Sequence, residues 1–223
     1  VCVDPNDIPA VAIVDPELMY SMPKGLTAAT GMDALTHAIE SYITPGAWVM
    51  SDMFELKAIE MIAQNLKAAV DNGKDVAARE AMSQAQYIAG MGFSNVGLGI
   101  VHSMAHPLGA FYDTPHGVAN ALLLPYVMEY NAESPAAPKY IHIAKAMGVD
   151  TTGMSEAEGV KAAIEAVKAL SISINIPQKL HEINVKEEDI PALAVAAFND
   201  VCTGGNPRPT SVADIEALYH KAF

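Results

Sequence analysis

The sequence predicts an all-α fold, a bundle in which helices pack on one another. Hydrophobic residues make up 51% of the 223 residues but aromatic residues only 6%, and the apolar side chains are chiefly those of Ala, Leu, Ile, Val and Met. This composition favours helices that bury small and aliphatic side chains against each other. Apolar residues also recur at helical spacing along most of the chain, which is long enough to bury a sizeable core.

The first 22 residues depart from this pattern. The segment from Val11 to Val14 predicts a short, buried strand between turn signals. A lone strand needs a sheet to join. We therefore expect residues 1–22 to be a linker that carries a short extended remnant of an absent N-terminal domain, and residues 23–223 to form the helical domain.

The helices are predicted from apolar periodicity and from start and stop signals. A first helix begins after Pro23 and stops at Pro45, and a second, capped by Ser51 or Asp52, runs to about Val70. Further helices are expected over 76–94, over 98–106 with Pro107 at the end or opening the next turn, from 116 with a kink at Pro125, and over 138–147, 155–170, 187–200 and 212–222. The stretch 202–210 contains too many Gly and Pro residues to be regular.

Charge and composition exclude several classes of partner. The net charge of −13 and the absence of any Lys/Arg cluster argue against nucleic acid, whose phosphates would be repelled. Cys2 and Cys202 lie far apart with no Cys-x-x-Cys spacing, so neither a disulfide framework nor a thiolate zinc site is indicated. Because the sequence has neither an apolar run of about 20 residues nor a signal segment, we expect no membrane partner and a cytoplasmic location.

Two groups of residues predict a metal site. Three of the seven histidines, His102, His106 and His116, fall within fifteen residues among small and apolar neighbours. Burying imidazoles without partners would cost about 1–3 kcal/mol each, so packing alone is a poor explanation. Asp33 and His37 lie four residues apart on the first helix and therefore share a face. A carboxylate and imidazoles suit a divalent first-row metal, but the spacing leaves open which two of the three histidines complete the site.

These residues also have plainer interpretations than a metal site. An Asp-x-x-x-His pair alone is usually a solvated contact between neighbouring turns of a helix. The histidines could also connect helices in a structural metal-binding domain without catalysis, in which case all coordination positions would be filled by protein. The remaining histidines, His142, His181 and His220, lie in amphipathic surface patterns and are interpreted as structural.

Three stretches carry a resemblance to a known family. They are GMDALTHAIESY at 31–42, GLGIVHSMAHPLGAFYDTPHGVANALLLP at 97–125 and CTGGNPRPTSVADIEALYHKAF at 202–223. Together they resemble the iron-containing (group III) alcohol dehydrogenases. The resemblance implies that the chain corresponds to the dehydroquinate synthase-like α domain of this family, which holds the metal.

The resemblance also implies a role for each residue of the cluster. By position, Asp33 and His37 of the first motif would bind the metal, together with His102 and His116 of the second. His106 would be the catalytic proton relay beside the substrate and not a ligand. The implied metal is Fe²⁺, with Zn²⁺ as the alternative.

The implied reaction needs a part that this sequence does not show. Family members bind NAD in an N-terminal α/β domain through a Gly-rich loop, and no such loop occurs here. We therefore expect the chain to be the metal-binding half of an NAD-dependent enzyme, inactive alone and a homodimer at full length. Its substrates would be small aldehydes and alcohols, namely lactaldehyde and 1,2-propanediol. A 1,3-propanediol or butanol dehydrogenase, or a zinc enzyme like glycerol dehydrogenase, is the alternative.

Overall fold

The computed structural model describes residues 4–223 and confirms the all-α prediction. Helices account for 73% of the residues, and the described range contains nine α-helices and no strand. None of the helices in this range is both long and apolar enough to cross a membrane. The helices are α1 (Lys24–Ile43), α2 (Val49–Asp71), α3 (Val76–Val96), α4 (Ile100–Tyr112), α5 (His116–Asn131), α6 (Tyr140–Ala146), α7 (Glu156–Ser173), α8 (Ile190–Phe198) and α9 (Val212–Ala222).

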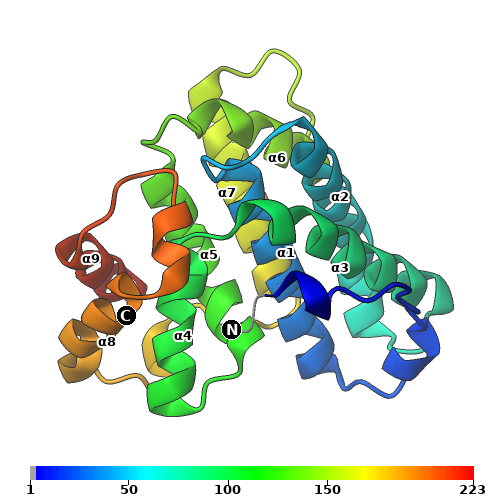
Figure 1. Ribbon diagram of the computed structural model, residues 1–223, viewed down its shortest axis with the longest axis horizontal. Coiled ribbons are helices and arrows are strands. Elements are labelled where there is room, and N and C mark those ends of the chain that lie inside the picture. The colour runs from blue at the N-terminus through cyan, green and yellow to red at the C-terminus, as the bar shows by residue number, and fades with distance from the viewer. Residues whose placement is uncertain (1–3) are drawn as a thin grey trace.

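The helices are arranged around a central group formed by α1, α4 and α5. Figure 1 shows α2 and α3 on one side of this group and α8 and α9 on the other, with α6 toward the top of the view and α7 running from there down the middle, where it overlaps α1. Helices α1 and α5 pack against each other, as do α4 and α5, while α2 covers α1 and α8 covers α4. Segments that are far apart in the sequence therefore meet at α1, α4 and α5.

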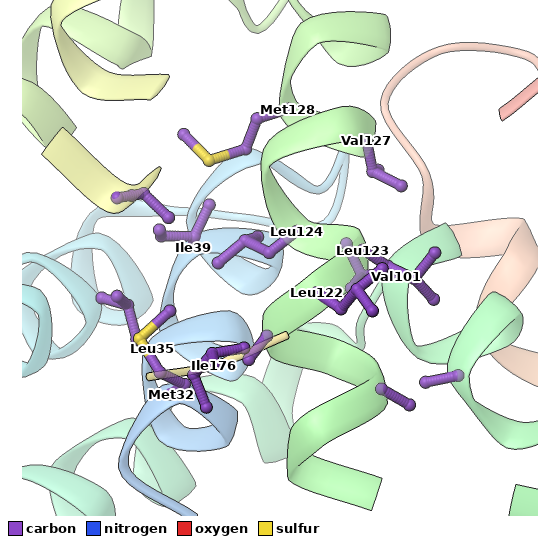
Figure 2. Packing of buried hydrophobic residues seen from close by; sticks show 14 of the residues in the cluster. Met32, Leu35, Ile39, Val101, Leu122, Leu123, Leu124, Val127, Met128 and Ile176 are labelled. Atoms are coloured by element: carbon purple, nitrogen blue, oxygen red, sulfur yellow. The ribbon is translucent and has the colours of Figure 1, made fainter. Parts of the chain in front are cut away.

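The core lies where α5 crosses its neighbours. Figure 2 shows Leu124 and Met128 of α5 on the side of Ile39 of α1, whereas Leu123 of α5 lies toward Val101 of α4. These five side chains are at most 1% exposed. Because α5 is apolar around most of its circumference, it can be buried on several sides at once, which suits its central position.

Two predicted helix ends differ from the structure. Helix α4 does not stop at Pro107 but continues through it to Tyr112, and the chain turns only at Asp113, whose φ is 52°. Proline lacks the N–H that would bond to the fourth preceding carbonyl, yet packing of the surrounding turns keeps the helix continuous. Helix α2 begins before Ser51, and the Ser51 hydroxyl accepts a hydrogen bond from the Trp48 backbone N–H at 3.0 Å.

The strand predicted at Val11 to Val14 was wrong. The segment has no regular structure, and its side chains are exposed, up to 90% at Ile13. A strand needs a neighbour for its backbone hydrogen bonds, and residues 4–223 provide none. Residues 1–3, including Cys2, lie outside the described range.

The close contact between α1 and the first turn of α5 requires a glycine. A Cβ atom added to Gly117 would lie 2.3 Å from the carbonyl oxygen of Ala29, much closer than van der Waals contact allows. The backbones of α1 and α5 can therefore approach only because residue 117 has no side chain. This approach places His116 beside Asp33.

We expect Gly117→Ala to destabilise the protein by about 1–3 kcal/mol, because the methyl group would push two backbones apart. The free energy of unfolding in urea measures the effect. Gly90→Ala on α3 is the matched control: no atom lies within 4 Å of its added Cβ, so this substitution should be neutral or slightly stabilising. Equal effects of the two substitutions would contradict the close approach.

Candidate metal centre

Three helices bring the predicted ligands together. Asp33 and His37 come from the middle of α1, His102 from the first turn of α4, and His116 is the first residue of α5. One ligand atom each from Asp33, His37 and His102 can be chosen so that all lie within 4.8 Å of one another. His116 joins this group through Asp33, since 3.5 Å separates its Nε2 from Asp33 Oδ1.

His102 is the most constrained member of the group. Its side chain is only 2% exposed, and its Nδ1 lies 2.6 Å from Oε2 of Glu40. The other oxygen of Glu40 accepts the backbone N–H of Val101 at 2.7 Å. Because the carboxylate accepts a hydrogen bond from Nδ1, the Nε2 atom of His102 carries the lone pair.

The surroundings of this Nε2 atom fit a bound metal. It is buried without a hydrogen-bond partner and lies 3.9 Å from Oδ1 of Asp33. A buried polar atom left unpaired costs about 1–3 kcal/mol, so such an atom in a native structure needs an explanation. A lone pair aimed at a carboxylate and at neighbouring imidazoles is explained by a cation between them.

His37 and His116 are also held in the form that binds metals. Burial, reinforced by the neighbouring His102 imidazole, lowers the pKa of His37 to about 4, and its Nδ1 donates a hydrogen bond to the Asp33 carbonyl oxygen at 2.8 Å. Burial likewise lowers the pKa of His116. A lowered pKa keeps each imidazole neutral near pH 7, with a lone pair available for coordination.

Sequence reasoning missed two residues of this centre. Glu40 received no role of its own, although an acid on an apolar helix face was a usable signal. Asn120 lies one turn after His116 on α5, and its Nδ2 donates to Asp33 Oδ1 at 2.6 Å and lies 3.0 Å from His116 Nε2. It is a polar residue in an otherwise apolar helix, and it holds the carboxylate beside the imidazole.

We expect Glu40→Gln to weaken metal binding by about 10–100-fold, because loss of an outer partner misorients the ligand that it holds. Glutamine has one acceptor oxygen, whereas the position serves two N–H donors. Titration of the metal-free chain with Zn²⁺ measures the affinity. Glu60→Gln, on the exposed surface of α2, is the control and should bind as the wild type does. Unchanged affinity in Glu40→Gln would contradict the role of this carboxylate.

His106 lies next to the cluster but points to a different partner. Its ring stacks on the His116 ring at a centroid distance of 5.4 Å, and its Nδ1 lies 2.7 Å from Oδ2 of Asp200. His106 and Asp200, together with Cys202, form a second group whose potential ligand atoms lie within 4.8 Å of one another. Burial and the charge of Asp200 raise the pKa of the Cys202 thiol to about 12, so the sulfur keeps its proton in the metal-free chain and a metal would have to displace it.

A cavity of about 350 Å³ opens beside the first cluster. Asp33 and His37 form part of its wall, and Phe93 of α3 faces it with its ring 4.4 Å from the His37 ring. The remaining wall is largely apolar and comes from α1, α3 and the segment before α1. This space adjoins the two proposed ligands and can admit a small molecule.

Comparisons with known proteins identify the family. The model of the Fe-containing alcohol dehydrogenase family, C-terminal, matches residues 27–223. The chain belongs to this family. A metal is therefore implied by family membership as well as by the orphaned nitrogen of His102.

Individual relatives support the same family. Lactaldehyde reductase of Escherichia coli (strain K12) is 60% identical over 223 residues, which is 100% of this chain and 58% of that protein. NAD-dependent methanol dehydrogenase of Bacillus methanolicus is 46% identical over 99% of this chain and 58% of its own length. The chain thus spans somewhat more than half the length of these relatives.

The fold agrees as well. A crystal structure of a 1,3-propanediol oxidoreductase superposes with a TM-score of 0.95 at 47% identity, over 97% of this chain and 56% of that one. The all-helical arrangement in Figure 1 is therefore the arrangement found in the matching part of that family member.

Proposed function

We propose that residues 23–223 are the metal-binding half of an NAD-dependent oxidoreductase that interconverts small aldehydes and alcohols. The observation that carries the proposal is the buried, unpaired Nε2 of His102, which is aimed at Asp33 beside a cavity. Residues 1–22 would be the linker to the NAD-binding part. Lactaldehyde and 1,2-propanediol are the favoured substrates because of the identity to the E. coli enzyme. 1,3-Propanediol is the second candidate because of the structural likeness.

In this proposal Asp33, His37, His102 and His116 hold Fe²⁺, with Zn²⁺ as the alternative, since one carboxylate and three imidazoles suit either metal. The bound metal supplies Lewis acidity toward the carbonyl oxygen, and NAD supplies the hydride. The protein fixes the ligand set before the metal arrives. Glu40 orients His102, Asn120 orients Asp33, and burial keeps His37 and His116 neutral.

The chain's own residues also prepare the space for the substrate and the path for a proton. The apolar wall around Phe93 excludes water from the side of the cavity next to His37. His106 is 34% exposed, stands beside His116 and has its Nδ1 occupied by Asp200. Its Nε2 therefore remains to pass a proton between solvent and the substrate oxygen, a role suited to imidazole near neutral pH.

The rival proposal is a structural metal site. A structural site fills its coordination positions with protein and needs no access for a second molecule. The cavity that adjoins Asp33 and His37 favours a site that a small molecule reaches.

A chimaera tests the proposed function. In it, this chain replaces the matching 58% of E. coli lactaldehyde reductase, and the remaining part of that enzyme is expected to supply the NAD-binding part. We expect NAD-dependent reduction of lactaldehyde after loading with Fe²⁺, and faster turnover of lactaldehyde than of 3-hydroxypropanal. A folded, metal-loaded chimaera without activity on either aldehyde would contradict the proposal.

A further inference from the structure

Asp200 approaches the metal centre from the far end of the chain. Its Oδ2 lies 2.7 Å from Nδ1 of His106, a residue 94 positions earlier. Asp200 is largely buried, with a side chain 17% exposed. No sequence motif pointed to this residue, and it is not one of the proposed metal ligands.

The carboxylate of Asp200 is itself held in place. Asp200 caps a 3₁₀ helix at Val201–Gly205, and its Oδ1 accepts the backbone N–H of Cys202 at 2.8 Å. The Thr203 hydroxyl of this helix lies 2.8 Å from the Ser103 hydroxyl of α4. The short helix is thereby tied to α4, the helix that carries His106.

Close packing strengthens this attachment. A Cβ atom at Gly205 would lie 1.9 Å from the carbonyl oxygen of Leu98, so the end of the 3₁₀ helix lies directly against the segment that leads into α4. Asp200 and His106 are therefore carried by two segments in fixed contact. The contact between the two side chains is therefore set by the packing of their backbone segments.

The hydrogen bond has a chemical consequence for His106. A carboxylate only accepts hydrogen bonds, so the ring nitrogen that faces it must carry the proton. In a neutral imidazole the other nitrogen then has the lone pair. The Nε2 atom of His106, on the side away from Asp200, is thus ready to take up a proton.

We propose that Asp200 is a positioning residue that holds His106 in the Nδ1–H tautomer, with Nε2 free for proton exchange with the substrate oxygen. The inference rests on the proposed function, because it assumes that His106 moves a proton. During aldehyde reduction the protonated ring gives its Nε2 proton to the product oxygen and becomes the neutral Nδ1–H tautomer. Solvent then restores the proton on Nε2, and alcohol oxidation runs the same steps in reverse.

A simpler interpretation is that Asp200 only caps the 3₁₀ helix. Asp200→Asn separates the two roles. Asparagine is as good a cap as aspartate and can still accept the Cys202 N–H. Its single oxygen cannot also accept from His106, so its amide N–H₂ group would face Nδ1 and require the opposite tautomer.

The tautomer is measured on this chain by ¹⁵N NMR of labelled histidine side chains, at a pH where the rings are neutral, with His106→Gln to assign the signals. We expect the Nδ1–H form of His106 in the wild type and the Nε2–H form in Asp200→Asn. In Asp200→Ala the alanine offers His106 no hydrogen-bond acceptor, so His106 should also lose the Nδ1–H form. The proposal is overturned if the wild type shows Nε2–H, or if neither variant changes the tautomer.

The chimaera adds a kinetic measurement. Asp200→Asn should lower kcat by about 10–1,000-fold, with the KM for lactaldehyde and the metal content nearly unchanged, because binding is intact and proton transfer is not. Asp189→Asn is the control, since that carboxylate accepts from the Tyr112 hydroxyl away from the cluster. If the wild-type chain bound no metal, the proposed function would fail while the tautomer result could still stand. A tautomer that never changes would refute only the role of Asp200.

Discussion

Replacing His102 with alanine is expected to lower metal affinity more than about 100-fold, beyond the 10–100-fold loss typical of an outer partner. Among the described residues, His102 supplies the one buried side-chain nitrogen that lacks a hydrogen-bond partner, and its removal also leaves Glu40 as a buried carboxylate without its imidazole. The variant should therefore lose a ligand and gain an unpaired charge. Anaerobic titration of the metal-free chain with Fe²⁺ or Zn²⁺ measures the affinity.

His220→Ala is the matched control for this experiment. His220 is 45% exposed on α9, where it faces Glu187, far along the chain from the cluster. Its removal should leave metal affinity unchanged. If His102→Ala bound metal as tightly as the control, the ligand set proposed here would be wrong.

The second large effect is expected for His106→Ala in the chimaera. Loss of a residue that donates or accepts a proton in the transition state typically lowers the rate by about 10²–10⁴-fold. Metal content should be retained, since Nδ1 of His106 is bound to Asp200 and the four proposed ligands remain. Steady-state kinetics and elemental analysis of the same sample measure both quantities. Loss of the metal would show instead that His106 is a ligand.

Much of the fold follows from local patterns. The boundaries of α1 and α9 were predicted from apolar spacing with the flanking Pro, Gly and Ser residues, and the structure confirms them. Local patterns failed where packing decides the outcome. Pro107 stays inside α4, and the apolar run at Val11 to Val14 is exposed because no strand of the described range pairs with it.

The candidate site divides in the same way. Asp33 and His37 were predicted to share a face because they lie one turn apart, and both reach the cluster. Spacing could not distinguish His102 from His106, which share a face of α4. The structure separates them by their partners, since Glu40 comes from α1 and Asp200 from the chain's other end. Such contacts depend on tertiary structure, so spacing along the chain cannot predict which partner each histidine has.

Within residues 4–223, two groups of side chains could hold a metal. The proposed centre has only nitrogen and oxygen donors, whereas the group around His106 and Asp200 includes the sulfur of Cys202. Burial favours the protonated thiol of Cys202, which disfavours the second place.

X-ray absorption spectroscopy of the zinc-loaded chain tests this choice most directly. We predict about one bound zinc, surrounded by nitrogen and oxygen at about 2.0–2.2 Å with scattering from several imidazole rings. A sulfur neighbour at about 2.3 Å would place the metal on Cys202 and contradict the account, as would a chain that binds no zinc at all.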